Sequence, residues 1–350
     1  MNLQHFRYYT REDLKRGTRL RRFETKAGER FQVSHGTDLL ARLTSATATY
    51  VLFGIPENIG VKANGGTGGT ATAWPSFLEA FLNIQSNDFF SGDAVMVLGH
   101  FDFTDLERLI DGNAGNEEER VVACRHAVAA IDEEVEKLVK AIVSAGKFPI
   151  VIGGGHNNAY PLLKGAAKGL QQAQQTPIPQ INCINLDAHA DYRPEEGRHS
   201  GNAFRYAESD GFLQKYCVIG LHENYLQQNV WVDLVNNPFM DCITYEDIFI
   251  HEKRSFIQAV AHAIDFTEDG FTGIELDLDS IENVLSSAMT PCGISAREAR
   301  QYVSLCAAST KAAYLHLCEG ATVLEDGKKN EATGKLLSYL VTDFIKMHMD

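Results

Sequence analysis

The segment 185–192 reads N-L-D-A-H-A-D-Y and places Asp187, His189 and Asp191 at a spacing of two residues. Successive side chains of an extended strand point to opposite faces, so this spacing puts the three groups on the same side of the backbone. The run 181–186 before them is largely apolar, as expected for a buried parallel strand. Ligands usually bind beyond the carboxyl ends of such strands. The segment therefore predicts a metal site at a strand end.

Two other segments end apolar runs with residues of the same kind. The run 148–152 leads through three glycines into His156, and the run 271–278 ends in E-L-D-L-D at 275–279, with Asp277 and Asp279 again two apart. The glycines allow a sharp turn and a close approach of the imidazole to an ion. Together the three segments supply two imidazoles and four carboxylates as candidate metal ligands: His156, Asp187, His189, Asp191, Asp277 and Asp279.

This set of side chains is chemically suited to a pair of divalent cations. Four carboxylates packed together without cations would repel one another, and their pKa values would rise. Four carboxylates and two imidazoles suit Mn²⁺, and Ni²⁺, Co²⁺ and Zn²⁺ are chemically compatible. Two ions that share a water lower its pKa and generate a nucleophile near neutral pH. A single D-x-D is commonly a turn, but three such segments, each closing an apolar strand, together predict a two-metal hydrolytic centre.

Predicted strands alternate with predicted helices along the chain, which favours a three-layer α/β/α fold with a mostly parallel sheet. Residues 1–45 have no strong periodicity and are interpreted as a peripheral N-terminal extension, which leaves 46–350 as one catalytic domain. Apolar runs predict strands at 50–55, 94–98, 148–152, 183–186, 216–219, 271–278 and 314–317. Helical periodicity is found at 117–145, 295–313 and 333–348.

Charge and cysteine content narrow the classes of function. The net charge of −14 at pH 7 argues against nucleic acid or an anionic membrane as a partner. The seven cysteines are scattered without a C-x-x-C pair, which favours free buried thiols over disulfides or a zinc ribbon. No apolar run approaches the length of a membrane span, and the first residues lack the apolar core of a signal peptide. A cytoplasmic protein is therefore expected.

The long Gly-rich segment 56–70 resembles a phosphate-binding loop only superficially. It has neither the G-K-[ST] ending of a P-loop nor the spacing G-x-G-x-x-G. We expect it to form the rim of an active site, either flexible or tightly turned.

The ordered set G-G-G-H, N-L-D-A-H-A-D and D-L-D resembles the ureohydrolase superfamily of arginases, agmatinases and formimidoylglutamases. The resemblance spans about residues 50–345 and includes G-I-P-E-N after the first predicted strand, L-G-H-F-D-F at 98–103 and T-P-C-G-I-S-A-R-E-A around Glu298. It implies an arginase-like fold with an eight-stranded, mostly parallel sheet and a binuclear manganese site. It also implies hydrolysis of a C–N bond at a guanidino or formimino carbon, and assembly as a homo-oligomer, a trimer or a hexamer.

The resemblance further implies roles for individual residues. The six candidate ligands fall on the six metal-ligand positions of the family, with Asp187 and Asp277 as the bridging carboxylates. Asp191 would also orient the nucleophile and return a proton to the leaving amine. Glu298 falls where the family has an acid that pairs with the cationic head of the substrate.

The loop after the second ligand segment departs from the arginase pattern. It reads R-H-S-G-N-A-F-R over 198–205, which puts Ser200 where arginases and agmatinases carry a proton-shuttling histidine. This is nearer to the S-G-T-P-F-R of formimidoylglutamases. His199 is a candidate substitute for that histidine, with an exposed loop histidine as the alternative. Arg205 is a candidate for bidentate binding of a substrate carboxylate, and Asn202 for lining the pocket; an ordinary ion pair and a satisfied loop amide are the alternatives.

The sequence as a whole therefore favours an enzyme with two Mn²⁺ per chain that hydrolyses N-formimidoyl-L-glutamate to L-glutamate and formamide. A guanidino substrate, such as arginine, agmatine or a guanidino acid, with release of urea is the alternative. A histone-deacetylase-like enzyme would use one zinc and a different ligand set. A catalytically silent relative that binds a metal or a small molecule is disfavoured because the ligand segments are intact.

Overall fold

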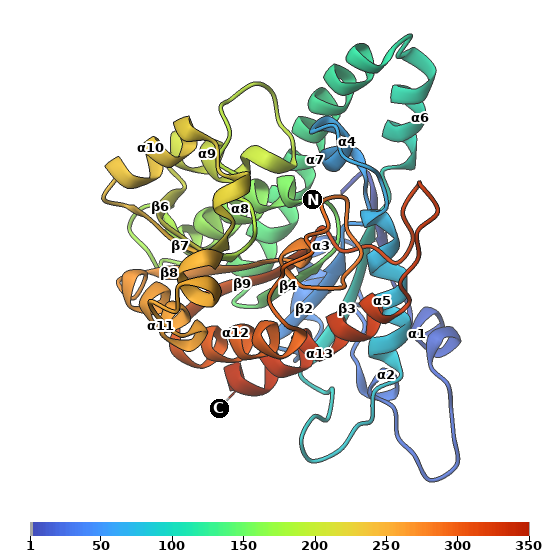
Figure 1. The fold of residues 1–350 in the computed structure, drawn as a ribbon. Coiled ribbons are helices and arrows are strands. Elements are labelled where there is room, and N and C mark those ends of the chain that lie inside the picture. Colours follow the sequence, from blue (N-terminus) through green and yellow to red (C-terminus); the bar gives the residue numbers. More distant parts are fainter. Residues whose placement is uncertain (1–2, 350) are drawn as a thin grey trace.

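Short apolar segments of the chain lie side by side at the centre of the computed structural model, which describes residues 3–349. They form one nine-stranded sheet in the order β1-β3-β2-β4-β9-β8-β5-β6-β7, and Figure 1 shows helices on both faces of this sheet. The strands are β1 Phe6–Tyr8, β2 Tyr50–Gly54, β3 Val95–Phe101, β4 Phe148–Ile152, β5 Ile181–Leu186, β6 Leu213–Leu221, β7 Met240–Thr244, β8 Phe271–Asp277 and β9 Lys311–Cys318.

Strands β2 to β9 are parallel to their neighbours, and only β1 is antiparallel, where it pairs with β3. The expected three-layer α/β/α fold with a mostly parallel sheet is confirmed, with one correction to the strand count. Eight strands are parallel as expected, and the N-terminal segment adds a ninth at the edge. Neither β1 nor β7 was predicted, because β1 has three residues and β7 is interrupted by the partly buried Asp241 and has no long apolar run.

The helices cover the two faces of the sheet with separate apolar cores. One core contains side chains of α7, α8 and α9, and the other contains side chains of α5, α11, α12 and α13. Within residues 3–349, no helix is both long and apolar enough to cross a membrane. The helices are α1 Arg11–Gly17, α2 Ala27–Arg30, α3 Leu39–Thr44, α4 Ile59–Ala63, α5 Ala73–Leu82, α6 Thr104–Asn113, α7 Glu117–Ser144, α8 Ala159–Gln172, α9 Ala203–Ser209, α10 Gln228–Asn236, α11 Phe256–Phe266, α12 Ala296–Ser309 and α13 Ala332–Met349.

The N-terminal segment is built into the same unit as the rest of the chain. Phe6 of β1, Leu14 of α1 and Phe31 after α2 are buried, and Phe31 stacks on Phe81 of α5 with ring centroids 4.8 Å apart. Residues 3–45 therefore contribute an edge strand and core side chains, in contrast to the peripheral extension expected from their weak periodicity. Their apolar residues are too widely spaced to give a clear period, and long-range packing decides their position.

The candidate metal ligands lie at the ends of strands in the centre of the sheet. In the order β4-β9-β8-β5, strands from distant parts of the chain become neighbours, because β8 and β9 lie between β4 and β5. From β5, the strands β6 and β7 follow toward one edge of the sheet, whereas β8 and β9 lie on the other side of β5. Crevices at such switch points are the usual binding sites of open α/β sheets. All three ligand segments follow β4, β5 or β8, so their side chains meet at one edge of the sheet.

Candidate active site

The loop after β4 positions His156 through two glycines in the left-handed region of backbone space, Gly153 with φ 86° and Gly154 with φ 77°. A Cβ atom on Gly154 would lie 2.5 Å from Asn158 Nδ2 and 2.8 Å from Ile55 O, so a side chain does not fit there. This turn brings the fully buried imidazole of His156 back over the end of the sheet.

The first group of candidate ligands surrounds Nδ1 of His156. This atom lies 2.8 Å from Asp191 Oδ2, 3.2 Å from Asp187 Oδ2 and 3.3 Å from Asp277 Oδ2. One donor atom from each of these four residues lies within 4.8 Å of the others, which is compatible with a shared metal ion.

The second group contains Asp187, His189 and Asp279, again with donor atoms within 4.8 Å of one another. His189 Nδ1 lies 3.1 Å from Asp279 Oδ2 and 3.6 Å from Asp187 Oδ1, and the imidazole stacks on Tyr225 with centroids 5.1 Å apart. Asp187 belongs to both groups and so lies where a bridging ligand is needed. Asp277, the other expected bridging residue, belongs to the first group.

The ligand residues that are two apart in sequence are brought together by a turn after each strand, and not by an extended strand. β5 ends at Leu186, and the next residues turn because the N–H of His189 donates to Asp187 Oδ1 (2.7 Å). In the same way, the N–H of Asp279 donates to Asp277 Oδ1 (2.8 Å) after β8. Each aspartate thus turns the chain with its Oδ1 atom, while its Oδ2 atom faces Nδ1 of His156.

The pKa values of two ligand carboxylates, Asp191 and Asp277, are raised as the composition of the site predicts, whereas that of Asp187 is lowered. Burial, and the charge of Asp187 beside it, raise the pKa of Asp191 to about 6. Burial and the charge of Asp279 raise the pKa of Asp277 well above its ordinary value. Burial alone would also raise the pKa of Asp187, but contacts with His156 and His189 lower it well below the ordinary range.

The donor set fits divalent cations. Both ring nitrogens of His156 and the Oδ1 atom of Asp279 are buried without a hydrogen bond of acceptable geometry to any residue in 3–349, although Nδ1 of His156 lies close to three carboxylates. Buried polar atoms are almost always paired, so unpaired donor atoms converging with four carboxylates indicate a site for positive charge. The mixture of carboxylates and imidazoles suits Mn²⁺ among the common metals.

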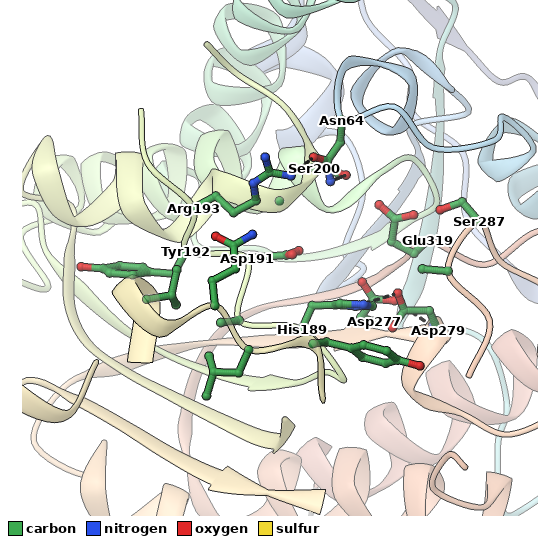
Figure 2. A pocket seen from close by; sticks show the side chains of 17 residues that line it. Asn64, His189, Asp191, Tyr192, Arg193, Ser200, Asp277, Asp279, Ser287 and Glu319 are labelled. Carbon is green, nitrogen blue, oxygen red and sulfur yellow. Dashed lines mark hydrogen bonds and ion pairs between the residues drawn. The ribbon is translucent and has the colours of Figure 1, made fainter. Parts of the chain in front are cut away.

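A pocket of about 180 Å³ opens over this cluster. Figure 2 shows His189, Asp277 and Asp279 together at its base, with Glu319 beside them and Arg193, Ser200 and Asn64 across the opening. The lining comprises Asn64, His189, Ala190, Asp191, Tyr192, Arg193, Ser200, Gly201, Tyr225, Leu226, Gln227, Val230, Asp277, Asp279, Ser287, Ala288 and Glu319. Asn64 follows α4 in the Gly-rich segment, so this segment contributes to the rim as expected.

Two of the residues expected near the substrate are used inside their own loop. His199 is fully buried: its Nδ1 accepts from the N–H of Gly201 (3.1 Å), and its Nε2 contacts Glu196 Oε1 (3.2 Å). Burial, followed by the charges of Arg193 and Arg125, lowers the pKa of His199 to about 4. It therefore lies in the loop as a neutral structural group, and not as an exposed histidine.

Asn202 is also fully buried and supports the loop. Its Oδ1 accepts from Arg198 Nη1 (2.9 Å), and its Nδ2 donates to Gly197 O (2.8 Å). Ser200, by contrast, lines the pocket and accepts a hydrogen bond from Asn64 Nδ2 (3.3 Å). Of these three residues, Ser200 alone lines the pocket.

Arg205 and Glu298, both expected near the substrate, lie outside the pocket lining. Arg205 pairs with Asp233 and lies 3.9 Å over the ring of Tyr192, so it joins α9 to α10. Glu298 caps α12: its Oε2 accepts from the N–H (2.8 Å) and the hydroxyl (2.7 Å) of Ser295. S-A-R-E is the S-x-x-E signature of a capping box, which explains this carboxylate by local structure alone.

Glu319 and Arg193 are charged residues of the pocket lining that sequence reasoning missed. Glu319 follows β9, is 5% exposed and accepts the N–H of His156 on Oε1 (2.9 Å). Burial raises the pKa of Glu319 to about 8, and the charges of Asp279 and Asp191 add to the rise. A single glutamate after an apolar run gives no pattern to detect. Arg193 was detectable, because it stands two residues after Asp191.

The fold and this site define the class of protein. A model of the Arginase family matches residues 48–345, and the chain belongs to this family. A formimidoylglutamase of Streptococcus pyogenes is 29% identical over 157 residues, a match that covers 43% of this chain and 46% of the relative. The aligned part thus spans about half the length of this curated relative.

Solved structures share the fold over most of the chain. Trypanosoma cruzi formiminoglutamase with Mn²⁺ has a TM-score of 0.66 and 21% identity, with coverage of 89% of this chain and 98% of that chain. Formimidoylglutamase from Bacillus subtilis has a TM-score of 0.70 and 17% identity, with coverage of 95% and 94%. A hypothetical agmatinase from Burkholderia thailandensis has a TM-score of 0.65 and 14% identity, with coverage of 91% and 89%. At these identities the likeness establishes the arginase fold.

Proposed function

We propose that this protein is a binuclear manganese hydrolase that cleaves a C–N bond of a linear amidine, with N-formimidoyl-L-glutamate as substrate and L-glutamate and formamide as products. The observation that carries the proposal is the six-residue ligand cluster at the base of a pocket whose wall presents an arginine. The formimidoylglutamases among the relatives support the choice of substrate.

The residues divide between two ions. His156, Asp187, Asp191 and Asp277 would hold one, and Asp187, His189 and Asp279 the other. Bound divalent cations would activate a water as nucleophile and stabilise the charge that develops at the amidine carbon. The Trypanosoma cruzi relative was solved with Mn²⁺, which agrees with the preference of this donor set.

Glu319 takes the role first expected for Glu298, the binding of the cationic amidine head. His156 N–H holds one carboxylate oxygen of Glu319, and the side chain lines the pocket beside the ligands. The positive charge of the ions and of the substrate favours the ionised carboxylate. Charge-assisted hydrogen bonds from the planar amidine would then fix the orientation of the carbon under attack.

Asp191 is the residue that would transfer a proton from water to the leaving amine. It is both a candidate ligand and part of the pocket lining, so it lies within reach of water and substrate. Water adds to the formimino carbon, the bond from that carbon to the glutamate nitrogen breaks, and Asp191 passes the proton taken from water to the departing amine.

Arg193 is the proposed anchor for a substrate carboxylate. Within residues 3–349 it is the only Lys or Arg that lines the pocket. Its Nη1 donates to Asn64 Oδ1 (2.9 Å) and its Nη2 to Glu196 Oε1 (2.8 Å), while its buried Nε has no hydrogen-bond partner in the described residues. A fixed guanidinium with a free donor suits a carboxylate, which glutamate supplies twice.

A guanidino acid, which would release urea, is the second candidate because it has the same two ends: a cationic planar head for Glu319 and a carboxylate for Arg193. Agmatine carries a second positive charge at its far end, which Arg193 would repel. The catalytically silent relative remains the third candidate.

A substrate panel on the manganese-loaded protein separates these candidates. Formiminoglutamate, arginine, agmatine and guanidino acids are each incubated with the protein, and formamide, urea and ammonia are measured separately. We expect formamide from formiminoglutamate. Urea from a guanidino acid without formamide would replace the substrate, and no product from any compound would support the silent relative.

Replacing Arg193 tests the carboxylate anchor. We expect Arg193→Met to raise KM for formiminoglutamate by about 10- to 100-fold with a smaller change in kcat, because the lost hydrogen bonds are present in both ground and transition states. Arg300→Met, which removes an arginine paired with Asp343 on the surface of α12 and α13, is the control and should leave KM unchanged. An unchanged KM in Arg193→Met would show that Arg193 does not bind the substrate carboxylate.

Assembly as a homo-oligomer and a location in the cytoplasm stay predictions.

A further inference from the structure

A second layer of polar side chains lies beneath the candidate ligands in the centre of the sheet. Glu275 of β8 pairs in register with Asn185 of β5 on one side and with His316 of β9 on the other, and all three are fully buried. Side chains two residues apart on a strand share a face, so Glu275 lies below Asp277. The proposed mechanism assigns no task to Glu275 or His316.

The carboxylate of Glu275 is fixed by its neighbours on β9. Its Oε2 lies 2.6 Å from His316 Nδ1, and its Oε1 accepts a hydrogen bond from the hydroxyl of Tyr314 (2.7 Å). Its third neighbour is His156, whose Nε2 lies 3.5 Å from Oε2, an ion-pair contact without the geometry of a hydrogen bond. Glu275 thus lies on the Nε2 side of the His156 ring. Nδ1, on the opposite side of the ring, faces Asp187, Asp191 and Asp277.

We propose that Glu275, held in place by His316 and Tyr314, is a positioning residue that keeps the Nε2 proton and the ring orientation of His156 such that Nδ1 is free to bind a metal ion. A metal-bound histidine commonly directs its other ring nitrogen to a carboxylate, and this contact fixes the tautomer and increases the basicity of the ligand. The inference rests on the proposed metal site and names residues that support it.

A simple structural role would predict a different behaviour. Glu275 stands between Ile274 and Leu276 in the central part of β8, where apolar packing on both faces is typical of parallel strands. A buried charge pair is weak support for a fold, because apolar side chains of similar size often serve as well. The two roles therefore differ in what the carboxylate controls, which is metal affinity in one case and the stability of the metal-free protein in the other.

A further alternative is that this layer itself binds a metal. His156, Glu275, His316 and Cys318 offer donor atoms within 4.8 Å of one another. The positioning role is favoured because both oxygens of Glu275 are already engaged by Tyr314 and His316. The metal count per chain decides between the two.

Mn²⁺ binding to metal-free protein tests the proposal without reference to any substrate. Wild type and Glu275→Gln are titrated by calorimetry and by electron paramagnetic resonance, in which a coupled pair of ions differs from an isolated ion. We expect Glu275→Gln to weaken one of the two ions by on the order of 10- to 100-fold. The spectrum at limiting Mn²⁺ should change from a coupled pair to an isolated ion, and the melting temperature of the metal-free protein should change little.

Two tyrosines provide a matched comparison. Tyr314→Phe removes one support of the Glu275 carboxylate and should weaken the same ion to a smaller degree. Tyr302→Phe removes an equally buried hydroxyl that donates to backbone oxygens of Ile184 and Glu275, and should keep wild-type affinity for both ions even where the metal-free protein melts earlier.

Three results would overturn the inference. Wild-type affinity for both ions in Glu275→Gln, or an equal loss in Tyr302→Phe, would reduce Glu275 to a structural residue while leaving the proposed function intact. Three ions per wild-type chain would make the layer a metal site. A wild-type protein that binds no Mn²⁺ would overturn this inference and the proposed function together.

Discussion

The base and the wall of the pocket are built in different ways. The base consists of side chains that follow β4, β5 and β8, each placed by a turn within its own segment. The wall is assembled from distant segments, with Asn64 after α4, Arg193 in the loop before α9 and Ser287 in the loop before α12. The base is therefore encoded in short motifs, whereas the wall depends on how long loops pack.

The largest effect is expected at the base, from Asp187→Ala. Asp187 belongs to both ligand groups, so its loss should weaken both ions and reduce turnover by about three orders of magnitude or more. The metal content of the purified protein and kcat are the measurements. Asp269→Asn, near the opposite end of the sheet, where Asp269 pairs with Lys215, is the control and should bind two ions. Full metal content in Asp187→Ala would show that the base has been misassigned.

A smaller effect is expected between base and wall, from Glu319→Gln. Loss of the charge that binds the amidine head should reduce kcat/KM by about 10²- to 10³-fold, with Mn²⁺ affinity largely retained. Glu298→Gln is the matched comparison: it should leave kinetics unchanged and lower the unfolding free energy by at most about 1 kcal/mol, because only a helix cap is altered. The reverse outcome would support the assignment implied by family resemblance.

The smallest effect is expected behind the wall, from Arg205→Met. Arg205 makes a partly exposed ion pair with Asp233 and packs on Tyr192, so its loss should lower the unfolding free energy by about 0.5–1 kcal/mol. KM for formiminoglutamate should stay within about twofold of wild type, since Arg193 and not Arg205 lines the pocket. A large rise in KM would place Arg205 at the substrate after all.

The base could be predicted from the sequence because each part of it is local. D-x-H and D-x-D stand directly after apolar strands, and parallel strands end at the same edge of a sheet, so the ligands must meet. The backbone geometry of the ligand segments could not be predicted from the sequence. Asp191 has φ 44° and Asp187 turns the chain with its own carboxylate, neither of which follows from an extended strand.

The wall could not be predicted in the same way. Glu319 is one glutamate after β9, and its approach to the ligands depends on β9 lying between β4 and β8. Glu298 was placed at the substrate by resemblance although its capping-box pattern offers a sufficient local explanation. In the fold, the parallel strands followed from apolar runs, whereas β1 and β7 at the two edges are too short or too polar to be detected.

The position of β8 and β9 has a consequence for biosynthesis. Residues 3–244 can form only two half-sheets, β1 to β4 and β5 to β7, and the open edges of these halves are β4 and β5, the strands that carry His156 and Asp187. Unpaired strand edges in an incomplete chain are prone to aberrant association. Residues 271–318 close both edges at once and bring Asp277 and Asp279 with them, so a growing chain can assemble its candidate metal site only after residue 318 has been synthesised.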